Sequence, residues 1–144
     1  ETALTKIFFY HNAADRIAAT VTLLGKAYRQ GKAVLVYAPE AETAGALDRH
    51  LWTAPPTGFV PHVRGTSPLA GETPIVITED PASAGQHERL LNLSPEVPPG
   101  FSRFDSLIEV VGRDDTERQT ARERVKFYKD RGYAIQYFDL AETP

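Results

Sequence analysis

The chain has 144 residues, of which 42% are hydrophobic and 24% charged, and its formal net charge is −3 at pH 7. This size and composition predict one domain spanning residues 1–144 with its own hydrophobic core, and they exclude an intrinsically disordered chain. The absence of cysteine excludes disulfides, thiolate metal sites and cysteine nucleophiles. The negative net charge argues against a domain whose whole surface binds nucleic acid, but it leaves room for a local basic patch.

The sequence has no apolar run long enough to span a membrane and no charged, then apolar, then small-residue leader. We therefore expect a cytoplasmic protein with no membrane partner.

The first half of the chain alternates apolar runs with helical patterns. The run at residues 7–10 predicts a buried strand, and Asn12 is expected to cap the following helix, with Asp15 in its first turn. That helix should end near Gly31. Its apolar stripe consists of Ile17, Val21, Leu24 and Tyr28.

A second strand and helix follow directly. Residues 33–38 form a continuous apolar run, typical of a strand covered on both faces, and Pro39 ends it. The next helix should bury Ala44, Leu47 and Leu51. The order strand, helix, strand, helix predicts a largely parallel sheet with right-handed crossovers.

Periodicity then disappears between residues 53 and 72, which contain four prolines and three glycines, so we expect a surface excursion interrupted only by Phe59 and Val60. Strand-like runs occupy residues 74–78, 90–93 and 107–111. A last long helix, capped by Asp114 and Asp115, should run to about Arg131, followed by a strand at 133–138. The predicted fold class is α/β: a single Rossmann-like three-layer domain with a largely parallel central sheet flanked by helices.

The sequence predicts no catalytic site. It contains no Gly-rich phosphate loop, no dinucleotide fingerprint after the first strand and no nucleophile elbow, so the domain should lack a nucleotide-binding loop. Its four histidines, which show no metal-ligand spacing, read best as surface or hydrogen-bonded residues: His11, His50, His62 and His87. Neither a cofactor nor a metal is therefore expected.

The last helix carries a basic stripe, defined as Arg118, Arg122, Lys126 and Lys129. At about 100° per residue these side chains fall within roughly 80° of one another, and Glu123 and Asp130 lie outside that arc. An apolar strip of Ala121, Val125 and Tyr128 adjoins them. Such an edge suits an acidic peptide that ends in a hydrophobic residue, and a nucleic acid backbone would also fit the charges. The alternative is a solvated helix face, and the geometry alone favours neither interpretation.

Trp52, the only tryptophan, stands where the periodicity of the second helix ends. A large aromatic at such a position is either part of the core or a partly exposed anchor at an interface, and the sequence leaves both interpretations open.

Two motifs resemble those of the DNA polymerase III chi subunit family. Leu51-Trp52 with the Phe-Val-Pro-His run at 59–62, and the last helix at 121–128 with Gly132-Tyr133, resemble that family in order and spacing. The resemblance extends over nearly the whole chain. It implies a non-enzymatic replisome accessory with a Rossmann-like fold that binds the acidic C-terminal tail of single-stranded-DNA-binding protein. The association with single-stranded DNA would then be indirect. That tail ends in aspartates, an apolar pair and a phenylalanine carboxylate.

The resemblance also implies roles for individual residues. Arg122 and Lys126 would bind the tail carboxylates, and Val111 and Val125 would form the walls for the phenylalanine. Arg118 and Lys129 are added from the helical geometry. Many relatives are expected to have an aromatic where this chain has Val125, so the pocket is either shallower or uses Tyr128 instead.

A second surface is implied for another partner. Trp52 and Phe59 match the family's contact with the psi subunit, which links chi to the clamp loader and for which a helicase competes. The alternative function in another class is a small Rossmann-type nucleotide-dependent enzyme. A third, direct binding of single-stranded DNA, would need aromatics interleaved with the basic stripe, and only Tyr128 qualifies.

Overall fold

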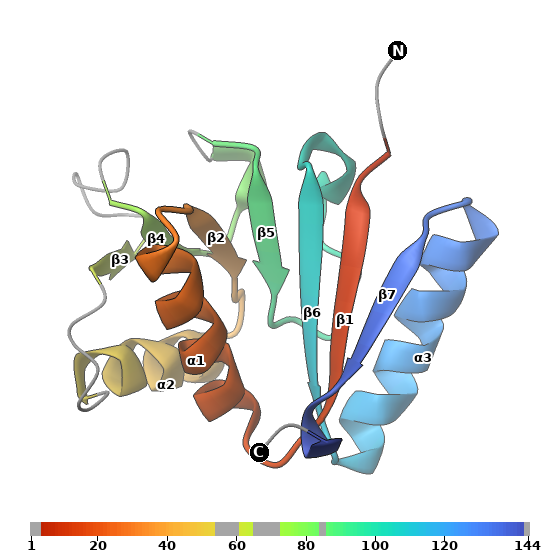
Figure 1. Cartoon of the computed structure of the whole chain (residues 1–144), viewed down its shortest axis with the longest axis horizontal. Helices are drawn as coiled ribbons and strands as arrows, with labels where there is room; N and C mark the ends of the chain where they lie inside the picture. Colours follow the sequence, from red (N-terminus) through yellow and green to blue (C-terminus); the bar gives the residue numbers. More distant parts are fainter. Residues whose placement is uncertain (1–3, 54–60, 65–72, 84–85, 143–144) are drawn as a thin grey trace.

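The strands of the described residues form one seven-stranded sheet, with strand order β3-β4-β2-β5-β6-β1-β7 (Figure 1). The computed structural model describes residues 4–53, 61–64, 73–83 and 86–142. All six neighbouring strand pairs are parallel. The strands are β1 (Lys6–Ala13), β2 (Val34–Tyr37), β3 (His62–Arg64), β4 (Ile75–Thr78), β5 (Arg89–Asn92), β6 (Ser106–Gly112) and β7 (Ile135–Asp139).

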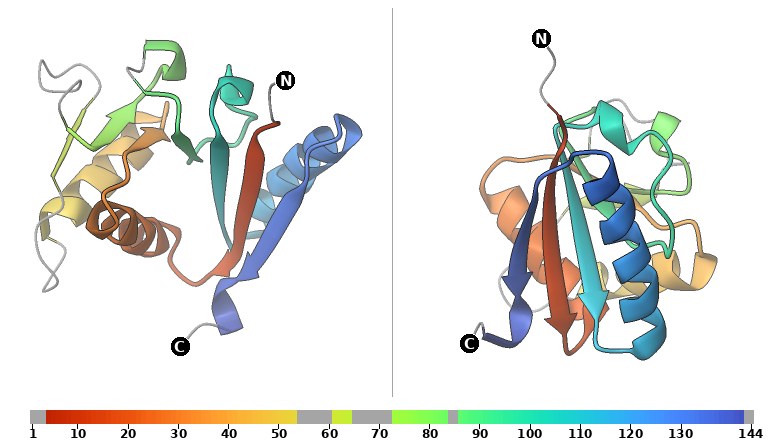
Figure 2. Two further views of the ribbon diagram at one scale, coloured as in Figure 1. Left: turned by 45° about the horizontal axis from the view of Figure 1, so that its top comes forward. Right: turned by 90° about the vertical axis from the view of Figure 1, so that its right-hand side faces the viewer.

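Helices cover both faces of this sheet and give the fold three layers. The helices are α1 (Arg16–Arg29), α2 (Ala41–Thr53) and α3 (Asp115–Asp130). Figure 2 shows α1 and α3 on opposite sides of the sheet. The core on the side of α1 and α2 includes Leu24, Leu47 and Leu91, all nearly inaccessible to solvent. The core on the other side includes Leu107 and Tyr128. The α/β three-layer fold expected from the sequence is confirmed.

Most of the expected elements occur close to their predicted positions. Ala44, Leu47 and Leu51 are buried on α2 as expected. Asp114 caps α3, with its carboxylate accepting hydrogen bonds from the backbone amides of Thr116 and Glu117. Within the described residues, no helix has the length and the apolar character needed to cross a membrane.

The start of α1 differs from the expectation. Asn12 is not the helix cap: it lies inside β1 with φ 65°, at an irregularity in the pairing of β1 with β6. Asp15 caps the helix instead, its carboxylate accepting from the amide of Ala18 at 3.1 Å. The strand continues because it pairs on both edges, with β6 and β7, and Asn tolerates the left-handed conformation that the bulge requires. The apolar stripe of α1 is also shorter than predicted, because Tyr28 is exposed.

The expected surface excursion contains a strand. β3 pairs with β4, so the prediction that only Phe59 and Val60 interrupt the excursion is wrong at residues 62–64. The buried His62 accounts for this, since its imidazole lies 3.0 Å from the Asp48 carboxylate of α2 and anchors the strand. The hydrogen-bonded interpretation of this histidine is confirmed. Residues 54–60 and 65–72 lie outside the described residues.

A buried ionic network lies between the sheet and α3, and we define it as Asn92, Glu109, Arg124 and Tyr128. The Arg124 Nε atom is 3.1 Å from Glu109 Oε2, and both side chains are buried. The Tyr128 hydroxyl donates to the same carboxylate at 2.7 Å, and Asn92 Nδ2 donates to it at 3.1 Å. Burial, followed by the charge of Glu109, raises the pKa of Tyr128, so its hydroxyl remains a donor.

The first prediction tests this network. Arg124→Met should lower the free energy of unfolding by about 3–5 kcal/mol, because Glu109 would stay buried without its counter-charge. Arg122→Met is the matched control: it is on the same helix but exposed, and should change stability by less than about 0.5 kcal/mol. Urea denaturation followed by circular dichroism measures both. Equal stability of the two variants would contradict the role of the buried pair.

Candidate functional site

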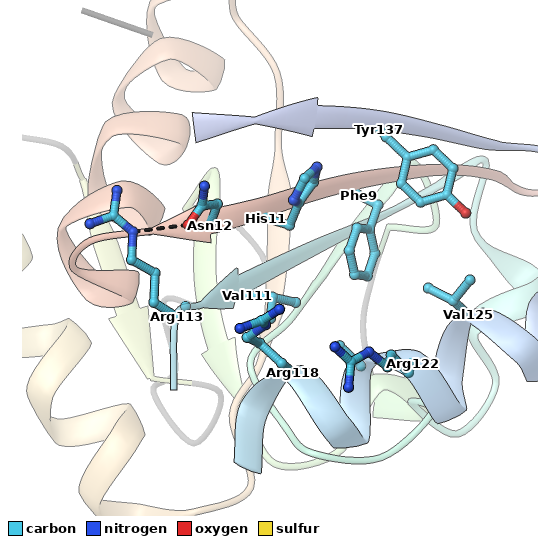
Figure 3. A pocket seen from close by; sticks show the side chains of 11 residues that line it. Phe9, His11, Asn12, Val111, Arg113, Arg118, Arg122, Val125 and Tyr137 are labelled. Atoms are coloured by element: carbon cyan, nitrogen blue, oxygen red, sulfur yellow. Dashed lines mark hydrogen bonds between the residues drawn. The ribbon is translucent and has the colours of Figure 1, made fainter. Parts of the chain in front are cut away.

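A pocket of about 460 Å³ lies between α3 and the strands β1, β6 and β7 (Figure 3). Aromatic and aliphatic side chains form its floor, and arginines stand at its rim. The lining residues are Phe9, His11, Asn12, Val111, Gly112, Arg113, Arg118, Ala121, Arg122, Val125 and Tyr137. None of these described lining residues is acidic, so the pocket combines positive charge with apolar surface.

Strand alternation forms the apolar floor. Every second side chain of a strand points to the same face, so Phe9 and His11 of β1 both face α3. The parallel register places Tyr137 of β7 directly beside Phe9. Their rings meet edge to face, with centroids 5.7 Å apart. Val111 and Ala121 complete the floor and are almost fully buried.

The rim is basic because it includes the start of α3. Arg118 and Arg122 are one helical turn apart, exposed, and stand on the helix side of the pocket in Figure 3. Arg118 has only a weak contact with Asp115, a 4.0 Å pair in which both side chains are largely exposed. Both guanidinium groups are therefore accessible to an anionic ligand.

A third arginine is held in place by hydrogen bonds. Arg113 Nε donates to Asn12 Oδ1 at 2.9 Å, and Asn12 Nδ2 donates to Asp139 Oδ1 at 3.2 Å. The backbone amide of Ala141, and then the Asn12 amide, lower the pKa of Asp139 by hydrogen bonding to its carboxylate. The Asn12 amide therefore connects Arg113 to Asp139 at the edge of the pocket.

The structure brings together four of the residues expected from the sequence: Val111, Arg118, Arg122 and Val125 all line the pocket. Lys126 and Lys129 are exposed on the same helix but do not line it. Lys129 lies next to it, with its ammonium group 5.8 Å from the centroid of the Tyr137 ring. The two lysines extend the positive charge along α3 beyond the pocket.

The suggestion that Tyr128 forms the pocket is wrong. Its side chain is fully buried, and its hydroxyl is bonded to Glu109. The buried face of α3 consists of Ala121, Arg124 and Tyr128, a spacing of three and four residues that turns Tyr128 towards the sheet. The sequence analysis missed the two aromatic side chains of the apolar floor, Phe9 and Tyr137. Strand alternation predicts that every second side chain of β1 and β7 shares a face of the sheet. It does not predict that α3 covers the face of Phe9 and Tyr137.

Trp52 lies far from this pocket in the fold. It is 61% exposed at the end of α2, which settles the question left open by the sequence in favour of an exposed position. Its ring packs edge to face on His62 of β3, with centroids 5.1 Å apart. β3 and β7 are the opposite edges of the sheet. Phe59, predicted to share this surface, lies outside the described residues.

The fold and the pocket together define an α/β domain with a basic, apolar-floored binding pocket. Comparison with known families identifies which such domain this is. The model of the family described as DNA polymerase III chi subunit, HolC, matches residues 4–136. The chain belongs to this family, as the motifs in its sequence had suggested.

Individual relatives agree with this assignment. The DNA polymerase III subunit chi of Pseudomonas aeruginosa is 27% identical over 92% of this chain and 95% of the relative. The subunits chi of Escherichia coli and Haemophilus influenzae are 29% and 31% identical over 75% and 78% of this chain, and the matches cover 74% and 79% of those relatives. The family match over residues 4–136 includes Trp52 and every lining residue of the pocket except Tyr137.

The second prediction separates the core role of Tyr128 from the pocket. Tyr128→Phe should lower the free energy of unfolding by about 1.5–3 kcal/mol, because it removes a hydrogen bond to a charged group. It should leave the affinity for an acidic peptide ending in phenylalanine unchanged. Val125→Ala is the comparison variant, because it removes part of the pocket wall and should weaken that affinity. Thermal unfolding and fluorescence anisotropy measure the two effects. Loss of peptide affinity in the folded Tyr128→Phe variant would show that Tyr128 contributes to the peptide-binding site.

Proposed function

We propose that this chain is a non-catalytic replisome accessory subunit whose pocket binds the acidic C-terminal tail of single-stranded-DNA-binding protein. A second surface, around Trp52, connects it to the clamp loader through a psi-like partner or binds a competing helicase. The observation that carries the proposal is the pocket itself, in which arginines surround an apolar floor without any acidic lining residue among those described. Family membership favours this role over the nucleotide-dependent enzyme considered from the sequence.

The chemistry of the tail matches this pocket at two points. A terminal phenylalanine ring needs an apolar cavity, and its carboxylate and the preceding aspartates need cations at the rim. Phe9, Val111 and Val125 offer the cavity. Arg118 and Arg122 are four residues apart, about 6 Å along the helix axis, so they can bind two carboxylates of one extended peptide.

The aromatic contact missing at Val125 is available from the sheet. Tyr137 and Phe9 already meet edge to face, and a phenylalanine ring inserted beside them would extend this arrangement. A volume of about 460 Å³ is within the usual range for small-ligand pockets. Lys126 and Lys129 continue the positive charge along α3, where the aspartates further from the tail's end would lie.

The third prediction concerns Arg122. Arg122→Glu should weaken binding of a tail peptide at least about tenfold, since it replaces one charge-assisted hydrogen bond by repulsion. Stability should be unaffected because the residue is exposed. Anisotropy titrations should also show affinity falling with salt, while the apolar floor preserves some binding at high salt.

Lys26→Glu is the control for Arg122→Glu, because it makes the same change of charge on α1, on the other side of the sheet. It should bind the tail peptide like the parent. If Arg122→Glu, still folded, bound the peptide as tightly as the parent, the basic stripe would be a solvated helix face and the proposed site would be withdrawn.

The fourth prediction tests the independence of the two surfaces. Trp52→Ala should leave tail affinity unchanged, because Trp52 is at the opposite edge of the sheet from the pocket. It should weaken capture of a psi subunit by about tenfold or more, as expected for an aromatic anchor at an interface. Pull-down with psi and anisotropy with the tail peptide measure both. Loss of tail binding in the folded variant would show that the two surfaces are one.

A further inference from the structure

The open-face cluster, defined as Phe8, Tyr10 and Phe138, lies on the side of the sheet opposite to the pocket. Phe8 and Tyr10 alternate along β1 with Phe9, so they point away from α3. The parallel register places Tyr10 directly beside Phe138 of β7. Those two rings are stacked, with centroids 4.6 Å apart and an interplanar angle of 16°, and Phe8 lies 6.4 Å from Phe138.

No described helix covers this cluster. In Figure 1, α1 lies over the half of the sheet nearer β2, and the same side of β1 and β7 carries no helix. The consequence is visible in the burial of one strand: Ile7 and Phe9 of β1 are buried beneath α3, whereas Phe8 and Tyr10 are only half-buried. Phe138 is 37% exposed. Several aromatic rings that share one solvent-facing surface are typical of a binding surface.

Positive charge lies beside the β1 part of the cluster. A groove of about 210 Å³ runs from Phe8 and Tyr10 to the last turn of α1, and its lining includes Lys26, Lys32 and Arg89. No acidic residue is among the described residues that line it. Arg89 shares its charge with Glu88, 3.2 Å away, so the two lysines supply most of the free positive charge. Lys6, exposed two residues before Phe8, adds a cation at the same face.

We propose that this open face binds single-stranded nucleic acid directly. Bases would stack on Phe138 and Tyr10, and phosphates would lie along Lys26, Lys32 and Lys6. Single-strand binding uses this combination, because every base has a stackable π face and the backbone needs a cationic track. A duplex would not fit, since its bases already stack on one another. An acidic peptide would fit the lysines, but it would need an aromatic side chain at each ring, whereas every base of a single strand offers a π face.

This proposal does not rest on tail binding. The two sites use opposite faces of β1, with Phe9 and His11 lining the pocket and Phe8 and Tyr10 lining the groove. A strand of nucleic acid and a tail peptide could therefore be bound at the same time. It also changes the interpretation of direct single-strand binding considered from the sequence, because the stacking aromatics adjoin Lys26 and Lys32 and not the basic stripe of α3.

Anisotropy of a labelled oligothymidylate of about 15 nucleotides, a length on the order of one site, tests the proposal with the full chain. Phe138→Ala should weaken binding about tenfold. The double variant Lys26→Ala, Lys32→Ala should lower the slope of log affinity against log salt by about 1.4, since each lost phosphate contact contributes about 0.7. Neither variant should change affinity for the tail peptide.

Tyr137→Ala is the matched control, because it removes the neighbouring, similarly exposed aromatic of β7, which faces α3 instead. It should spare oligonucleotide binding. If Phe138→Ala does not fold, the lysine double variant still tests the proposal, because both lysines are surface residues and their substitution should not affect folding.

Three results would overturn the proposal: no oligonucleotide binding at low salt, equal losses in Phe138→Ala and Tyr137→Ala, or binding that depends on Arg122 and not on the two lysines. Self-association that Phe138→Ala abolishes, without oligonucleotide binding, would assign the face to a second copy instead. Failure of the tail-peptide titrations would leave this proposal unaffected.

Discussion

The ion pair between Glu109 and Arg124 is the contact on which the position of α3 depends. Its carboxylate comes from the middle of β6 and its guanidinium from the buried face of α3, at 3.1 Å. Arg124 also donates to the carbonyl oxygen of Pro95 at 3.0 Å, and Asn92 donates to Glu109, so the segment after β5 is tied to the same point. A buried charge pair needs all these partners, because its desolvation is costly and only well-formed hydrogen bonds offset it. The requirement favours one position of α3 on the sheet, and the pocket beside α3 depends on that position.

β1 connects the features of functional interest. It lies between β6 and β7, and its alternation sends Phe9 and His11 to one face and Phe8 and Tyr10 to the other. One face is covered by α3 and forms a pocket, whereas the other is only flanked by α1 among the described helices and forms a groove beside it. A single strand can therefore contribute to two sites, because successive side chains of a regular strand point to opposite faces.

Local charge explains how an acidic chain can have basic binding surfaces. The net charge is −3, yet the described residues that line the pocket and the groove include arginines and lysines and no acid. Acidic side chains stand just outside these linings, such as Asp115 near Arg118 and Glu88 beside Arg89. Electrostatic attraction of an anionic ligand depends on this local field, and it decays over roughly 10 Å at 0.1 M salt.

The sequence by itself determined the α/β class, most strand and helix positions, the family and four residues of the pocket. These follow from local signals: apolar runs, helical spacing, capping residues and short motifs. Only the tertiary structure decided that Asn12 is a bulge and not a cap, that residues 62–64 form a strand, that Tyr128 is buried, and that Phe9 and Tyr137 form the aromatic walls. Each of these depends on a partner far away in the chain, such as β7 for Asn12, Asp48 for His62 and Glu109 for Tyr128. A helical pattern shows which residues share a face, but it does not show which face meets the sheet until a long-range contact such as Glu109–Arg124 selects it.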